Sequence, residues 1–289
     1  MRKTVLKVCL IVISAMFMAY PWISNWLFSR QAGSKVGLYE ERLSSMKPDS
    51  LTKMLEKAQW YNDRLDQNQV KLTDPFMETE EPAKWEESYD KLLDLGNGLM
   101  GFIEIPVIDV KLPIFHGTDT VTLENGIGHL KGSSLPVGGE GTHTVLTGHT
   151  GLNKAKLFTD LEVMKEDDLF FIKCAGQVLC YRVFRIQVVE PEETENLTVV
   201  PGRDLATLIT CTPYGVNSHR LFVTGERTEY TKEVKKEAKK QETRHIDSRW
   251  MNTYRNAALT GTFIAIAIIG IHKFIMKKKG RHRDGSSLF

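Results

Sequence analysis

A long apolar run near the C-terminus constrains this chain more than any other feature. The residues from Ala257 to Met276 are almost all apolar, and a helix needs about 20 such residues to cross a bilayer. Five basic residues follow directly: Lys277, Lys278, Lys279, Arg281 and Arg283. Because lysine and arginine are enriched on the cytoplasmic side of membrane helices, we predict a transmembrane helix at 256–276 and a cytoplasmic tail at 277–289.

A second apolar segment lies at the start of the chain, from about Val8 to Phe28, behind a short basic stretch. It is apolar all round rather than along one face, which argues against a core helix. The region 1–29 is therefore a secretory signal or an anchor, and the lack of a clear small-x-small cleavage site favours an uncleaved anchor. Two spans with both termini in the cytoplasm place residues of about 30 to 255 outside the membrane.

The overall composition is that of a globular protein, with 42% hydrophobic and 26% charged residues and a net charge of +2. Such a balance gives no reason to expect a nucleic-acid partner. Of the four cysteines, Cys9 falls in the first span, which leaves Cys174, Cys180 and Cys211 in the exported part. Three thiols allow at most one internal disulfide. A bond between Cys174 and Cys180 and two separate buried thiols both stay open, and Cys211 is left over.

The exported part changes character at Gly96. Residues 30–95 are predicted to be helical, with apolar residues at spacings of three and four and an acidic, proline-containing loop. From 96 to 228, short apolar runs alternate with glycine, proline and asparagine turns. This pattern predicts a mainly β domain, either a closed barrel or a sandwich. The segment 229–255 is polar and is predicted to be a solvated stalk.

Three residues of the β region carry reactive groups. Cys211 ends the run LATLITC, Arg220 begins RLFVTGER, and His149 lies between glycines in LTGHTG. If the first two runs are antiparallel neighbours, Cys211 and Arg220 face each other with backbones about 5 Å apart. A thiolate is a nucleophile, histidine transfers protons and arginine suits an oxyanion, so the set fits acyl transfer. Taken singly, the same residues are equally well a buried thiol, a turn histidine and a surface charge.

Other polar groups are less specific. A second acidic loop, residues 190–195, holds four glutamates, which fit a solvated loop better than a calcium site: Glu190, Glu192, Glu193 and Glu195. We therefore predict no metal and no cofactor. His143 is placed at the start of a strand near the site, without an assigned role, and His116 is placed in a turn.

The stretches LTGHTG, TLITCTPYGVNSHRLFVTGER and GLNKAKLFTDL resemble the sortases, and most closely the class C, pilin-polymerising group of Gram-positive bacteria. The resemblance covers most of residues 96 to 228. It implies an eight-stranded sortase β-barrel, with an N-terminal helical and lid region and flanking transmembrane helices. It also places His149, Cys211 and Arg220 on the family's catalytic positions.

The resemblance further implies a lid. Class C sortases carry an Asp-Pro-aromatic motif over the active site, and Asp74, Pro75 and Phe76 match that motif. Pro75 fixes its own φ and keeps Asp74 extended, so that Asp74 is expected to pair with Arg220 and Phe76 to cover Cys211. A plain proline turn in an acidic loop is the alternative.

The function implied is that of a membrane-anchored cysteine transpeptidase. Such an enzyme cleaves Leu-Pro-x-Thr-Gly-type sorting signals between Thr and Gly and joins pilin subunits through a lysine isopeptide bond. Its partners are pilins that carry a sorting signal and an acceptor lysine. One alternative is a housekeeping sortase that attaches surface proteins to cell-wall precursor. Another is a non-enzymatic, membrane-anchored β-domain that binds a partner.

Overall fold

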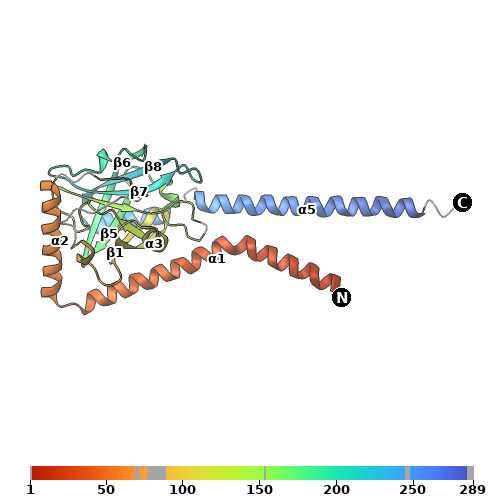
Figure 1. Ribbon diagram of the computed structural model, residues 1–289, viewed down its shortest axis with the longest axis horizontal. Helices are drawn as coiled ribbons and strands as arrows, with labels where there is room; N and C mark the ends of the chain where they lie inside the picture. The colour runs from red at the N-terminus through yellow and green to blue at the C-terminus, as the bar shows by residue number, and fades with distance from the viewer. Residues whose placement is uncertain (1, 69–71, 77–88, 153, 245–247, 285–289) are drawn as a thin grey trace. The chain divides into compact units, whose positions relative to one another are not determined.

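The computed structural model describes residues 2–68, 72–76, 89–152, 154–244 and 248–284, which divide into two compact units. The larger unit is Pro21–Ser248, and the smaller holds the two ends of the chain, Met1–Tyr20 and Arg249–Phe289. Long helices run through the ends: α1 spans Arg2–Ser45 and α5 spans Arg249–Asp284 (Figure 1).

The C-terminal helix has the character of a membrane anchor. Among the described residues, Arg249–Ile271 is the one stretch that is long and apolar enough to cross a bilayer. It begins earlier than the predicted span of 256–276, because the helix already starts at Arg249. The N-terminal span remains a prediction.

Eight strands close into a barrel in the order β1-β2-β3-β4-β7-β8-β6-β5. Their bounds are Leu99–Ile105 (β1), Val110–His116 (β2), Ile127–His129 (β3), Thr142–Thr147 (β4), Leu169–Cys174 (β5), Gln177–Val189 (β6), Asp204–Thr212 (β7) and His219–Thr228 (β8). β2 runs parallel to β3 and β4 runs parallel to β7, whereas the other neighbours are antiparallel. The predicted mainly β, eight-stranded barrel is confirmed.

Helices occupy the N-terminal region and several connections. After α1 comes α2, Pro48–Asn68, so the expected N-terminal helices are present. The shorter elements are η2 (Pro106–Ile108), α3 (Thr120–Asn125), η3 (Thr159–Val163), η4 (Glu195–Leu197) and α4 (Lys232–Glu242).

Strands β4 and β7 and most of β8 bury both of their faces. Side chains alternate between the faces of a strand, so neighbouring residues enter different clusters. On β4, β7 and β8 the main core receives Leu146, Leu208 and Val223. The opposite faces of the same strands form a second cluster with Val145, Ile209 and Phe222. This second cluster matters for function because it lies beneath the candidate site described below.

Cys174 and Cys180 are two separate free thiols. In the β5–β6 hairpin Cys174 is paired with Gln177 and Cys180 with Phe171, so the two cysteines are not opposite each other. Cys174 belongs to the main core and Cys180 to a small cluster beneath α4. Burial raises the pKa of both thiols to about 12, which makes them unreactive.

The segment after β8 is docked on the barrel rather than solvated along its whole length. Ala238 of α4 is buried against the barrel. Arg182 donates two hydrogen bonds to Glu237, both at 2.8 Å. Just beyond α4, Arg244 donates to Asp168 at 2.7 and 2.8 Å. The expected solvated stalk is therefore, up to this point, part of the folded domain.

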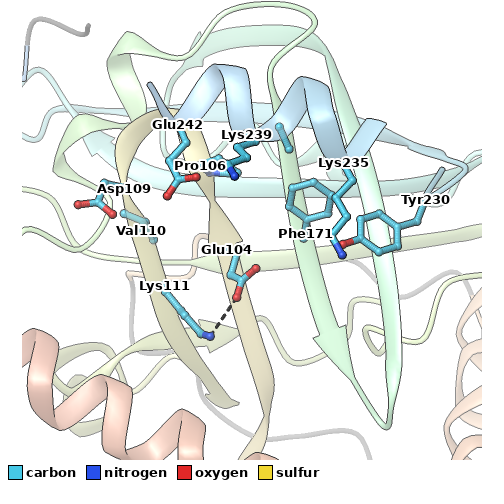
Figure 2. A pocket seen from close by; sticks show the side chains of 11 residues that line it. Glu104, Pro106, Asp109, Val110, Lys111, Phe171, Tyr230, Lys235, Lys239 and Glu242 are labelled. Atoms are coloured by element: carbon cyan, nitrogen blue, oxygen red, sulfur yellow. Dashed lines mark ion pairs between the residues drawn. The ribbon is translucent and has the colours of Figure 1, made fainter. Parts of the chain in front are cut away.

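A groove of about 410 Å³ lies between α4 and the strands β1, β2 and β5 (Figure 2). Its floor is partly apolar, with Val110 and Phe171, and its rims are charged. Glu104 in this groove pairs with Lys111 at 3.1 Å. None of the three candidate catalytic residues lines the groove, which is therefore separate from the site described next.

Candidate active site

Cys211 and Arg220 lie opposite each other at one end of the barrel. The β7–β8 ladder pairs Cys211 with Arg220, and Thr212 with His219. This register agrees with the antiparallel arrangement predicted from the two apolar runs. Both side chains are nearly enclosed, since each residue is 8% exposed. The thiol and the guanidinium therefore share a site that is shielded from water.

His149 reaches the same end of the barrel from β4. Since β4 runs parallel to β7, the residue after Gly148 comes level with Cys211. Gly148 N donates to Ile209 O at 3.0 Å, which extends the ladder by one step. Thr210 Oγ1 donates to Gly148 O at 2.7 Å. These two bonds fix the backbone just before His149, and the three candidate residues form one row across neighbouring strands.

His143 and His116, the two other histidines considered in the sequence, are held by hydrogen bonds within the fold. His143 is the second residue of β4, six residues and about 20 Å along the chain from His149. Its Nε2 lies 2.7 Å from Thr207 Oγ1 and its Nδ1 lies 2.8 Å from Thr198 O. His143 is therefore a buried histidine away from the reactive row. His116 is the last residue of β2, and both of its ring nitrogens face backbone carbonyl oxygens.

The segment 72–76 lies against this row. Arg220 donates two hydrogen bonds to Asp74, from Nε to Oδ1 at 2.8 Å and from Nη2 to Oδ2 at 2.6 Å. The side chains of this pair are 10% and 1% exposed, respectively. The guanidinium carbon of Arg220 lies 5.1 Å from the centre of the Phe76 ring. The centres of the Phe76 and His149 rings are 5.7 Å apart. Phe76 thus contacts the two residues that flank Cys211.

The ion pair with Arg220, an apolar contact and a hydrogen bond join the segment 72–76 to the barrel. Leu72 is buried and packs with Phe76 in the second cluster. Thr194 Oγ1, in the connection between β6 and β7, donates to Leu72 O at 2.8 Å. Phe76 N lies 3.4 Å from Asp74 Oδ1, and Pro75 between them is buried. The ion pair, the apolar contact and the hydrogen bond from Thr194 therefore hold the segment against the barrel, and the turn at Pro75 shapes the segment itself.

Burial favours the protonated form of the Cys211 thiol. Burial raises the pKa of Cys211 to about 11; the charge of Arg220 opposes this rise and the charge of Asp74 adds to it. Burial also lowers the pKa of His149, with Glu124 acting against the shift and Lys154 in its favour. Both directions favour a neutral thiol beside a neutral imidazole in this arrangement.

The site shows no metal-binding arrangement. In the described part of the chain, no group of three or more His, Cys, Asp or Glu residues is placed to hold a metal ion. In the acidic loop 190–195, Glu190 Oε1 lies 3.2 Å from Nε2 of His219, and His219 is the residue beside Arg220.

The comparisons with known proteins agree on one family. The Sortase domain matches residues 103–228, which include the complete row of candidate residues. Sortase A of Streptococcus agalactiae is 32% identical over 118 residues, which is 39% of this chain and 47% of that protein. The chain thus spans about half the length of this curated relative.

Solved structures are matched over nearly their full length. Sortase C-1 from Actinomyces oris is 51% identical, with a TM-score of 0.60, and the match covers 63% of this chain and 99% of that chain. The pilus-related sortase C of Group B Streptococcus is 40% identical, with a TM-score of 0.60, and the match covers 66% and 96%. At such identities the similarity extends beyond the fold.

Proposed function

The chain belongs to the sortase family, and we propose that it is a membrane-anchored cysteine transpeptidase that joins pilin subunits. One observation carries the proposal: Cys211 and Arg220 are opposite in the β7–β8 ladder, and His149 comes level with them from β4. The pilin substrate is supported by the lid and by the likeness to a sortase described as pilus-related. The substrate is a sorting signal of the Leu-Pro-x-Thr-Gly type.

The first half of the reaction forms a thioester. When the lid opens, His149 takes the thiol proton and the sulfur of Cys211 attacks the threonine carbonyl carbon. Arg220, freed from Asp74, holds the substrate and stabilises the oxyanion. The bond between threonine and glycine breaks, and His149 gives the proton to the departing glycine amine.

The second half transfers the acyl group. A lysine amine of another pilin attacks the thioester carbon, so an isopeptide bond forms and the bond to sulfur breaks. The proton lost by the amine passes through His149 to the sulfur, which restores the Cys211 thiol. The two halves conserve the energy of the original amide, and neither requires a metal or cofactor.

The lid serves as the gate of this reaction. In the closed form Nε and Nη2 of Arg220 are occupied by Asp74, and Phe76 lies against His149 and Arg220. Substrate binding therefore requires the segment 72–76 to move, as active-site lids commonly do. We place the catalytic domain outside the cell and both termini in the cytoplasm, because basic residues follow the apolar stretch Arg249–Ile271 and precede the N-terminal one. The stretch Arg249–Ile271 itself supports only the anchoring.

The test is polymer formation by the purified full chain. The chain is mixed with a pilin that carries a sorting signal, and products are separated on denaturing gels and mapped by mass spectrometry. We expect covalent ladders with a threonine-to-lysine isopeptide bond. Cys211→Ala removes the nucleophile and should lower the rate by at least about a thousandfold. Cys180→Ala removes another buried free thiol outside the site and is the matched control.

Each rival function has its own outcome in this assay. Ordinary ladders with Cys211→Ala would refute the mechanism. Products that require cell-wall precursor would identify a housekeeping sortase instead. If no thioester forms and Cys211 reacts slowly with iodoacetamide even in the Asp74→Ala variant, the domain is a non-enzymatic binding module.

A further inference from the structure

We propose that Ser24 and Asn25 of α1 position the loop that begins with His149. The predicted segment 1–29 includes both residues, but from Pro21 onward α1 belongs to the compact unit of the barrel, so we place the membrane span N-terminal to Pro21. The section of α1 that follows the span would then be part of the active-site framework. This inference rests on the proposed function, because it assigns a positioning role within that reaction.

The C-terminal part of α1 is packed on the catalytic domain. From Pro21 onward the helix belongs to the same compact unit as the barrel. Phe28 packs against the main core, and further along Ala32, Val36 and Tyr39 are 2%, 2% and 1% exposed. These residues follow one another at intervals of four, four and three, so they lie on one face of the helix. The face that continues from the anchor is therefore fixed to the barrel.

Two hydrogen bonds join this helix to the loop after β4. Ser24 Oγ donates to Lys154 O at 3.0 Å. Lys156 N donates to Asn25 Oδ1 at 2.8 Å. Both bonds are partly buried, and in each the helix supplies a side chain while the loop supplies its main chain. The helix thus fixes the path of the loop backbone, whatever side chains the loop carries.

The held section is closed back onto His149. Phe158 N donates to His149 O at 3.1 Å, which ties the far end of the loop to its first residue. Gly151 N donates to Thr159 Oγ1 at 3.1 Å and adds a second tie. Lys154 lies between these ties, so α1 holds the middle of the loop. Movement in the middle is transmitted to His149 at the end.

The same helix also steadies the charges around His149. Lys154 Nζ pairs with Glu124 Oε2 at 2.8 Å, and these two charges act on His149 in opposite directions. Glu124 lies on α3, and α1 reaches the end of α3 through Lys35 Nζ, which lies 3.2 Å from Asn125 Oδ1. Loss of the helix contacts would therefore expose His149 and disturb this charge pair together.

The test uses the full chain in detergent or nanodiscs, with the double variant Ser24→Ala/Asn25→Ala. Transfer of a sorting-signal peptide to a lysine acceptor is followed at steady state. We expect kcat to fall about tenfold, because an acid displaced by a fraction of an ångström donates its proton poorly. KM should stay within about twofold, since no substrate contact is removed. The acid limb of the pH profile should move to higher pH, because a more exposed His149 regains a higher pKa.

A second readout does not depend on activity. The Lys156 amide donates to Asn25 in the wild type, so its hydrogen exchange should accelerate in the variant. Ser44→Ala/Ser45→Ala is the matched control, because those hydroxyls donate to Glu41 O and Arg42 O within α1. Ser24→Thr/Asn25→Asp keeps an oxygen at both positions and should recover most of the rate.

The outcomes separate the two proposals. Unchanged kcat and unchanged Lys156 exchange overturn the positioning role. So does a loss of kcat that only follows a lower Tm, with the pH profile unmoved or with an equal loss in the control. A wild-type chain that forms no thioester on Cys211 overturns the proposed function instead, and Lys156 exchange then decides the helix contact by itself.

Discussion

Replacing Asp74 by alanine should turn the resting thiol into a reactive one. The substitution removes the two carboxylate oxygens that accept from Nε and Nη2 of Arg220, whereas Nη1 keeps its bonds to the carbonyl oxygens of Asn217 and His219. The side chains of the Arg220–Asp74 pair are 10% and 1% exposed. It also removes the negative charge that adds to the raised pKa of Cys211, and it frees Arg220 to act on the thiol. The apolar contacts of Phe76 and Leu72 and the hydrogen bond from Thr194 to Leu72 O would be left to hold the lid. We therefore expect the lid to open.

The size of the effect follows from the thiol. A pKa of about 11 leaves roughly one thiol in a thousand ionised at pH 8, whereas the ordinary value of 9.0 leaves about one in ten. Full release of the lid would thus speed alkylation of Cys211 about a hundredfold. Because burial is the largest cause of the shift, and the variant removes it only while the lid is open, we expect a gain of about tenfold or more.

The assay is alkylation by iodoacetamide from pH 6.5 to 10, followed by mass spectrometry of the Cys211 peptide. A raised pKa in the closed form means that closure is favoured fully below the open-state value and lost as pH rises towards about 11. The wild-type rate should therefore still climb beyond pH 9, whereas that of Asp74→Ala should level off there. Thr73→Ala, at an exposed neighbouring position, is the control. Equal rates and equal pH profiles in Asp74→Ala and wild type would refute the reasoning.

Two further predictions concern stability and topology. Burial lowers the pKa of His143 from 6.5 to about 4. The unfolding free energy is therefore about 3 kcal/mol larger above pH 6.5 than below pH 4, and this contribution is lost as the pH falls through 4. His143→Gln should lose less unfolding free energy than wild type between pH 7 and pH 4 in denaturant titrations, and parallel curves would contradict this. Tags at either end should resist protease on intact protoplasts, while a cleavage site inserted at the exposed Gly202 is cut; cleavage of either tag would contradict two cytoplasmic termini.

Local features of the sequence were sufficient to place part of the site. The runs that end at Cys211 and begin at Arg220 are joined by a short connection, so an antiparallel pair was the simplest arrangement and the register follows from it. The partnership with His149 depends on parallel pairing of β4 with β7, strands that are far apart in the chain. No local pattern encodes such a pairing, and the expectation came from resemblance.

The contacts that hold the lid and the loop were beyond the sequence for the same reason. Thr194 and Leu72 are 122 residues apart, and one hydroxyl and one carbonyl carry no signal of their own. The docking of α4 was different, because Val234 and Ala238 are one helical turn apart and mark an apolar strip within a polar segment. That spacing can be read from the sequence, but the high charge of the segment led to the prediction of a solvated stalk instead.

The bidentate pair of Arg220 and Asp74 makes the lid a competitor of the substrate. A guanidinium that grips a carboxylate with two donors cannot offer the same donors to a peptide, so the enzyme carries its own tethered ligand. The apparent affinity for a sorting signal is then the intrinsic affinity multiplied by the open fraction. If one molecule in a hundred is open, binding weakens about a hundredfold. The reduced apparent affinity disfavours peptides that are dilute in solution and favours signals presented at high local concentration, as on a membrane-held subunit beside the enzyme.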